Sequence, residues 1–184
     1  MGLKYVFNNQ DAPHFVTFTV IDWIDVFTRN DYKQLIVESL DYCRKNKGLI
    51  IYAWVIMTNH IHLIIGREGQ PSFSDIIRDF KTFTSSRIRS LIEKSNKESR
   101  KTWMMNRMNW RGSVNSRNID FQFWEQDNHP IILDSSEKAL QRLNYLHNNP
   151  VKAGFVSDPK HWLWSSAIDY ANGKGMLEIR LLDF

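Results

Sequence analysis

The sequence contains a single cysteine and no apolar run of membrane-spanning length. One thiol, Cys43, cannot form a disulfide within the chain, which favours a reducing compartment. No basic segment followed by an apolar stretch opens the chain, so we expect no secretory leader. These absences predict a soluble, cytoplasmic protein that makes no membrane contact.

Two classes of metalloenzyme are disfavoured by what the sequence lacks. It has no cysteine cluster and no His-Glu-x-x-His motif, the usual signatures of zinc sites and zinc hydrolases. Acidic residues near the histidines are too few for a nuclease that uses two metal ions. Any metal site in this chain is therefore expected to use a different set of ligands from these two classes.

The 184 residues fit one folded domain, 1–184, because 42% of them are hydrophobic and 13% are aromatic. No internal repeat or interdomain linker is visible. The net charge of +4 is mildly basic and is compatible with a polyanionic partner.

Residues 55–65 carry two histidines, His60 and His62, inside an otherwise apolar run. Side chains alternate along a strand, so both imidazoles are predicted to point to one face, with Ile61 and Leu63 on the other. Neutral imidazole nitrogens bind divalent metals, and the pair forms half of a candidate metal site. A chance His-x-His without function is the alternative that the spacing leaves open.

Hydrophobic periodicity predicts alternating strands and helices. In chain order they are a strand over 14–20, a helix over 30–46, strands over 49–57 and 60–65, a helix from Ser72, strands over 121–125 and 131–133, and a helix ending near Asn149. Residues 151–184 are expected to wrap the body as loop and short helix. This order predicts an α+β fold with a ferredoxin-like (RRM-like) antiparallel sheet and helices packed on it.

Local signals predict how some of these elements begin and end. Gly48 is expected to be the left-handed residue after the first helix. Asp134, with Glu137 in the reciprocal position, is expected to cap the last helix, and Pro150 is expected to end it. The strand over 49–57 is nearly all apolar, which is typical of a central strand covered on both faces.

Residues 96–120 form a basic insertion in which Trp103 and Trp110 are interleaved with lysines and arginines. Positive charge mixed with flat aromatic surfaces suits single-stranded nucleic acid. The segment is either a partly helical arm or a mobile basic loop, and a solvated loop beneath its own tryptophans is the non-functional alternative. Together with the helix from Ser72 it supplies the predicted DNA-binding side chains Arg78, Lys81, Arg87, Arg89, Lys101, Arg107 and Arg111.

On the last predicted helix, Tyr145 lies roughly opposite the apolar stripe and is not needed for the core. A phenol is a competent nucleophile toward phosphate when a divalent cation polarises the phosphoryl group. Asn149, one turn later, is placed to add an oxygen ligand beside the histidines. A packing role for Tyr145 and a helix-terminal role for Asn149 are the alternatives that the helix alone leaves open.

Two stretches, 53–65 (AWVIMTNHIHLII) and 144–156 (NYLHNNPVKAGFV), together resemble the single-tyrosine HUH transposases. Within them the chain is most similar to the REP-associated tyrosine transposases and their insertion-sequence relatives. Residues 121–125 and 164–166 also fit that group's pattern. The resemblance spans about residues 14–170, nearly the whole chain.

The resemblance implies an HUH endonuclease that cleaves and transfers single-stranded DNA and recognises hairpins, either REP-like or at insertion-sequence ends. Tyr145 would match the nucleophile that forms a 5′-phosphotyrosine link. His60 and His62 would match the ligands of Mg²⁺ or Mn²⁺. Asn149 would match a further polar ligand, and the protein is expected to be cytoplasmic and nucleoid-associated.

Several alternatives stay open at this point. Glu125 or His147 is an alternative to Asn149 as third ligand, and relatives of this kind occur both as monomers and as homodimers. The alternative function is a non-catalytic hairpin or single-stranded nucleic-acid-binding protein of the same fold, in which the histidines are structural. A metal bound at the histidines and a covalent protein–DNA adduct distinguish the enzyme from this alternative.

Overall fold

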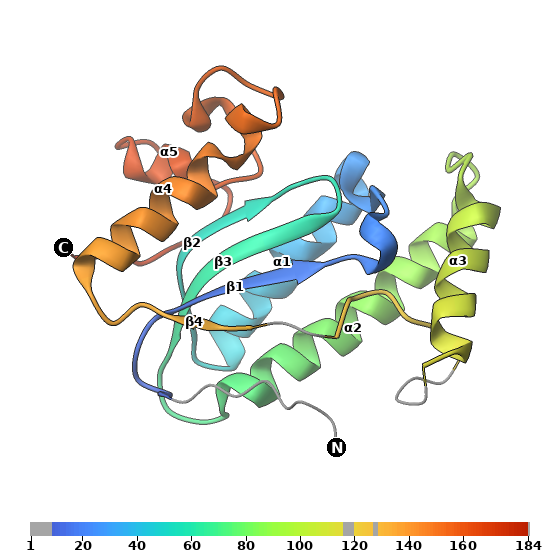
Figure 1. Ribbon diagram of the computed structural model, residues 1–184, viewed down its shortest axis with the longest axis horizontal. Helices are drawn as coiled ribbons and strands as arrows, with labels where there is room; N and C mark the ends of the chain where they lie inside the picture. Colours follow the sequence, from blue (N-terminus) through green and yellow to red (C-terminus); the bar gives the residue numbers. More distant parts are fainter. Residues whose placement is uncertain (1–8, 116–119, 127–128, 184) are drawn as a thin grey trace.

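The computed structural model of the chain describes residues 9–115, 120–126 and 129–183. Its centre is a four-stranded antiparallel sheet with the order β2-β3-β1-β4 (Figure 1). The strands are β1 (His14–Thr19), β2 (Leu49–Ile56), β3 (His60–Arg67) and β4 (Ile131–Ile132). The histidine strand is therefore a central strand, with β1 and β2 as its neighbours.

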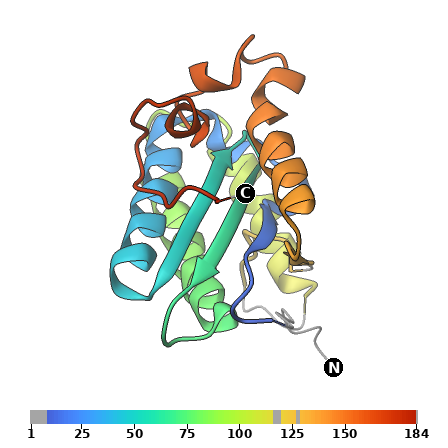
Figure 2. The same ribbon diagram turned by 90° about the vertical axis from the view of Figure 1, so that its left-hand side faces the viewer.

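Helices cover both faces of this sheet, as Figure 2 shows. On one face lie α1 (Asn30–Asn46) and α2 (Phe73–Lys94), and on the other lies α4 (Ser136–Lys152). The remaining helical elements are α3 (Lys101–Ser113), α5 (Ala167–Tyr170), η1 (Ile21–Trp23), η2 (Val26–Thr28) and η3 (Pro159–His161). The predicted α+β, ferredoxin-like architecture is confirmed. In the described ranges no helix has the length and apolar character needed to cross a bilayer.

The period of the strands divides the apolar residues between two cores. Phe18 and Ile61 belong to the core beneath α1 and α2. Phe15, Ile64 and Leu146 belong to the core beneath α4. Each side chain of this size contributes about 1.5–3 kcal/mol when fully buried, so Phe15, Ile64 and Leu146 hold α4 against the sheet. Because β3 alternates, its histidines share the α4 face with Ile64.

β2 is an edge strand in the pairing order, and the prediction of a central strand was wrong on this point. Its residues are nearly all apolar because α1 and α4 pack on its two faces and the C-terminal segment covers its edge. The Ile56 amide donates to the Trp164 carbonyl, and the Ser166 amide donates to the Trp54 carbonyl, both at 2.9 Å. The tail thus takes the place of a fifth strand.

Residues 121–125 do not form the predicted strand. Trp124 makes an isolated bridge with Val20, and the Glu125 amide donates to the Thr19 carbonyl over 2.8 Å. Beyond Val20 the chain turns into η1, so the neighbouring segment has no long straight edge to pair with. The alternating sequence therefore packs its aromatic residues without building a ladder.

The ends of α4 differ from the prediction. Its cap is Ser135, whose hydroxyl accepts from the Lys138 amide, while Asp134 forms an ion pair with Lys138 at 2.7 Å. The helix continues through Pro150 to Lys152, and the Ala153 amide donates to the Asn149 carbonyl over 3.0 Å. A proline in the last turn lacks the amide for one backbone hydrogen bond of the helix, and Pro150 is buried.

Gly48 ends α1 with φ of +65°, the left-handed conformation that the sequence predicted. A Cβ atom there would lie 2.2 Å from the Glu68 carbonyl oxygen, so the tight passage into β2 requires glycine. The close approach fixes the start of the β2–β3 hairpin.

The basic insertion is helical over 101–113, so the loop interpretation was wrong for these residues. Met104 and Met108 are buried where α3 packs beside α2. Trp103 and Trp110 are 56% and 50% exposed, and the Arg107 guanidinium lies 4.6 Å from the Trp110 ring centroid. Residues 116–119 of the predicted insertion lie outside the described part of the chain.

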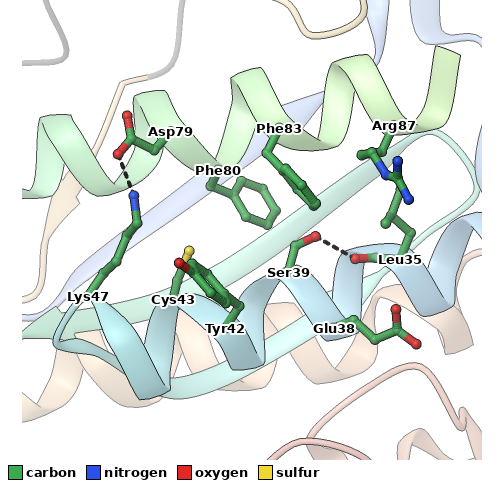
Figure 3. A pocket seen from close by; sticks show the side chains of 10 residues that line it. All are labelled: Leu35, Glu38, Ser39, Tyr42, Cys43, Lys47, Asp79, Phe80, Phe83 and Arg87. Atoms are coloured by element: carbon green, nitrogen blue, oxygen red, sulfur yellow. Dashed lines mark hydrogen bonds and ion pairs between the residues drawn. The ribbon is translucent and has the colours of Figure 1, made fainter. Parts of the chain in front are cut away.

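A groove of about 600 Å³ lies between α1 and α2, on the sheet face opposite α4 (Figure 3). Tyr42, Phe80 and Phe83 line it, and the ion pair of Lys47 and Asp79 lies near one end. Cys43 also lines the groove but is 3% exposed, and this burial raises the pKa of its thiol to about 11. The groove is separate from the histidine face.

Candidate active site

The two histidines of β3 lie side by side on the face covered by α4. Their ring centroids are 4.7 Å apart. The antiparallel register sets Thr17 of β1 opposite His62 and Thr19 opposite His60. The shared face predicted from the alternation of the strand is therefore observed, with β1 as the neighbouring strand.

His62 is held with one nitrogen engaged and the other without a partner. Its Nδ1 lies 2.7 Å from the Thr17 hydroxyl oxygen, whereas its buried Nε2 has no hydrogen-bond partner among the described residues. Burial is the main cause that lowers the pKa of His62 to about 3, and the neighbouring His60 and Arg142 lower it further. The ring is therefore neutral at physiological pH, and in the tautomer that donates from Nδ1 to Thr17 it offers the Nε2 lone pair to a metal ion.

His60 is oriented by the residue before it. Its Nδ1 lies 2.7 Å from Asn59 Oδ1, and the Asn59 amide nitrogen donates to Asp25 Oδ1 at 3.0 Å and to the Trp23 carbonyl at 3.3 Å. Because an amide oxygen only accepts, the proton of His60 lies on Nδ1 and Nε2 keeps its lone pair. Burial lowers the pKa of His60, while a hydrogen bond with the Asn149 side chain raises it in part.

Tyr145 of α4 comes up against the histidine pair in the same chain. Its ring centroid is 5.3 Å from that of His62 and 6.0 Å from that of Phe15. Its side chain is 38% exposed, so the phenol is open to an incoming ligand. The buried Leu143 and Leu146 on neighbouring positions fix the rotation of α4 that presents it.

Asn149 completes this group. One turn after Tyr145, its side chain raises the pKa of His60, and its Nδ2 donates to the Tyr145 carbonyl over 3.2 Å. The structure thus brings together all four residues that the sequence singled out for catalysis and metal binding. Two neutral imidazoles and an amide oxygen are a donor set that suits a divalent first-row cation.

The two alternative third ligands lie elsewhere. Glu125 accepts from Arg111 at 3.0 Å and from the Asp22 amide at 3.2 Å. His147 is buried beside Tyr170, and its Nε2 lies 2.9 Å from the Ser166 hydroxyl. Across the described ranges, no group of three His, Cys, Asp or Glu side chains could hold a metal ion. An amide is therefore the third donor that the geometry offers.

Sequence reasoning missed two cations of α4 that flank the site. The Arg142 guanidinium is 5.3 Å from the Phe15 ring centroid, and the Lys152 ammonium is 5.5 Å from the Tyr145 ring centroid. Positions 142, 145, 149 and 152 follow helical spacing. The helical-wheel argument that singled out Tyr145 could therefore also have identified Arg142 and Lys152. Their charges thus lie beside two aromatic rings of the site, Phe15 and Tyr145.

The cations predicted from α2 lie on the opposite side of the sheet from this site. Arg78 pairs with Asp75 at 2.7 Å, and Arg89 pairs with Glu93 at 2.9 Å. Arg87 lines the groove between α1 and α2. None of these three side chains belongs to the face that carries the histidines and Tyr145.

Lys81 does not fit its predicted role in DNA binding. It is 8% exposed, and its ammonium donates to the Glu125 carbonyl over 2.8 Å. A phosphate in solvent does not reach a buried ammonium that already has a partner, so we correct this assignment.

The predicted cations of α3 are engaged within the protein. Lys101 donates to the carbonyls of Glu93 and Ser95, at 2.9 and 3.1 Å. Arg107 pairs with Asp22 at 2.5 Å, and Arg111 pairs with Glu125 at 3.0 Å. These side chains thus fasten α3 to the body, and the two arginines hold the turn that follows β1.

Comparison with known proteins shows which family the chain resembles. The family model described as "Transposase IS200 like" matches residues 12–120, more than half of the chain, including both site histidines and ending before α4. A comparison with curated proteins finds no match.

The solved structures similar to this fold include two that are described as transposases. One is a REP-associated tyrosine transposase bound to a REP hairpin, with a TM-score of 0.65 and 17% identity, over 100% of this chain and 95% of that one. Another is a protein from Deinococcus radiodurans described as a putative transposase, with a TM-score of 0.46 and 16% identity, over 80% and 95%. At such identity, the first likeness supports the fold alone.

Proposed function

The chain belongs to the IS200-like transposase family, and from that premise we propose that it is a metal-dependent single-stranded DNA endonuclease and strand transferase. The observation that carries this proposal is the contact of the Tyr145 ring with His62, 5.3 Å between centroids. A nucleophile for phosphate and two neutral nitrogen donors meet on one face of one chain.

Each residue has a role in the proposed reaction. His60, His62 and Asn149 would hold Mg²⁺ or Mn²⁺, and the ion would withdraw charge from the scissile phosphate. The Tyr145 phenol oxygen forms a bond to phosphorus while the bond to the 3′-oxygen of the preceding nucleotide breaks. The phenol releases its proton to water, and the departing 3′-oxygen takes one up. The phosphotyrosine conserves the energy of the phosphodiester, so a second 3′-hydroxyl can reverse the step without ATP.

The geometry favours an active site made within one chain. Tyr145, His60 and His62 already lie in contact without a second subunit. We therefore propose a monomer as the catalytic unit, although a homodimer of such units remains compatible with this arrangement. Arg142 and Lys152 are the residues that we propose to neutralise the DNA backbone beside the phenol.

We propose hairpin-bearing single-stranded DNA as the substrate. A solved relative of the same fold carries a REP hairpin. The site of this chain is half-exposed at Tyr145 and lined by cations, as a single strand requires.

The proposal is tested with labelled single-stranded oligonucleotides from the flanks of the protein's own gene, containing predicted hairpins, in Mn²⁺ or in chelator. We expect an SDS-stable protein–DNA adduct with Mn²⁺, none in chelator, and none with Tyr145→Phe. Tyr42→Phe is the matched control, because Tyr42 is 58% exposed on α1, on the opposite face. An adduct that Tyr145→Phe still forms would refute the assignment.

A further inference from the structure

The turn after β1 holds a tryptophan in an unusual conformation beside the histidines. Asp22 and Trp23 both have positive φ, 52° and 55°, which bulky residues rarely adopt. The Trp23 side chain is 64% exposed. Backbone strain costs on the order of 1–3 kcal/mol per residue and persists where the surroundings enforce it. A strained turn that presents an indole to solvent calls for a functional reason.

Contacts from α3 hold this turn in place. The Asp22 carboxylate pairs with Arg107 at 2.5 Å and with Arg111 at 3.5 Å. The Asp22 amide donates to Glu125 Oε1 over 3.2 Å, and Glu125 itself pairs with Arg111. Two arginines and two carboxylates thus fix the backbone that carries Trp23.

The turn is also joined directly to the metal-binding face. Asn59 donates to the Trp23 carbonyl and, through Oδ1, accepts from His60. The Trp23 ring centroid is 5.8 Å from that of His60, with an angle of 69° between the planes. The indole therefore keeps a set position relative to the imidazole, as a binding surface requires.

Trp23 and Tyr145 flank different members of the histidine pair. Trp23 lies against His60 and Tyr145 against His62, and the two imidazoles are 4.7 Å apart. In an in-line displacement at phosphorus, the leaving oxygen lies opposite the attacking one. The nucleotide that leaves with the 3′-hydroxyl therefore extends from the phosphate toward His60 and Trp23.

We propose that Trp23 is a base-stacking residue, which holds the base immediately 5′ of the scissile phosphate and so sets the position of the cut. This inference rests on the proposed function and adds a substrate contact to it. Stacking on an indole accepts any base, because every base offers a π-face. Trp23 therefore aligns the strand, while selection among sequences belongs to other contacts.

The experiment measures binding of uncleaved DNA in the Tyr145→Phe background with Mn²⁺, using one oligonucleotide with and without an abasic site 5′ of the mapped cut. Trp23→Asn removes the ring while asparagine tolerates positive φ, and Trp23→Phe keeps an aromatic face. With Trp23 present, loss of the base should weaken binding about 5- to 150-fold. With Trp23→Asn both oligonucleotides should bind equally weakly, and Trp23→Phe should retain most of the difference.

Tyr42→Ala on α1 is the matched control, since Tyr42 is 58% exposed and lines the groove on the sheet face opposite the histidines, and it should keep the full base dependence. Equal base dependence with and without the Trp23 ring would overturn the inference, as would a dependence on the base 3′ of the cut instead. Failure of the native protein to form any DNA adduct would instead defeat the proposed function. Unchanged Mn²⁺ binding by Trp23→Asn checks that the histidine face is intact.

Discussion

The hydroxyl of Ser166 links α4, the edge strand and the C-terminal tail, and its removal tests how the site is held together. The side chain is fully buried. Its Oγ accepts from the Trp54 amide over 2.9 Å and lies 2.9 Å from His147 Nε2. The hydroxyl itself donates to the Trp54 carbonyl over 3.3 Å. Burial lowers the pKa of His147 to about 4, so this ring is neutral at physiological pH.

Ser166→Ala removes all three bonds and leaves a buried amide and a buried imidazole nitrogen without these partners. A hydrogen bond contributes about 1 kcal/mol net, and a buried polar group left unsatisfied costs about 1–3 kcal/mol. We therefore expect the free energy of unfolding to fall by about 2–4 kcal/mol, a large share of a typical total of about 5–15 kcal/mol. Urea unfolding at neutral pH, followed by circular dichroism, measures the change.

The matched control is Ser113→Ala at the end of α3, where an exposed hydroxyl donates to the Trp110 carbonyl over 2.9 Å. It should change stability by less than about 0.5 kcal/mol. If Ser166→Ala were equally mild, with an unchanged dependence on urea, this network would not be what fastens α4 to the tail.

Three further predictions concern the site and its surroundings. Asn59→Ala should weaken Mn²⁺ binding about 10- to 100-fold, because His60 loses the partner that orients it, and a titration followed by electron paramagnetic resonance measures this. Arg142→Gln should reduce the salt dependence of single-stranded DNA binding by about 0.7 in the log–log slope, whereas Arg78→Gln should leave it unchanged, as fluorescence anisotropy can show. Cys43 should react with a thiol reagent at pH 8 at least about tenfold more slowly in the native protein than in urea, because burial raises its thiol pKa to about 11.

Each of these predictions has a contrary result. Unchanged Mn²⁺ affinity in Asn59→Ala would remove Asn59 from the support of the metal site. An equal effect of Arg78→Gln and Arg142→Gln on the salt slope would mean that DNA also crosses the α2 face. Fast native labelling would show that the groove between α1 and α2 opens far enough to expose Cys43.

The sequence predicted the parts of the site that depend on local periodicity. His60 and His62 share a face because a strand alternates, and Tyr145 and Asn149 share a side because a helix repeats every 3.6 residues. Gly48 was predictable from another local signal, since a tight turn at a helix end needs a positive φ.

The sequence could not predict features that arise from distant contacts. Lys81 looked like a surface cation, but the carbonyl of Glu125, 44 positions later, binds it in the interior. The strain at Trp23 depends on Asn59 and on arginines of α3, which no local pattern connects. β2 appeared central because its residues are nearly all apolar, and no local pattern shows that the distant C-terminal tail covers its edge.

The most direct test of the account is to identify the residue that carries the DNA. The adduct formed with Mn²⁺ is digested with nuclease and protease, and mass spectrometry locates the nucleotide on the peptide. The account predicts one nucleotide joined through its 5′-phosphate to Tyr145. A nucleotide on another residue, such as Tyr52 or Tyr170, would contradict it.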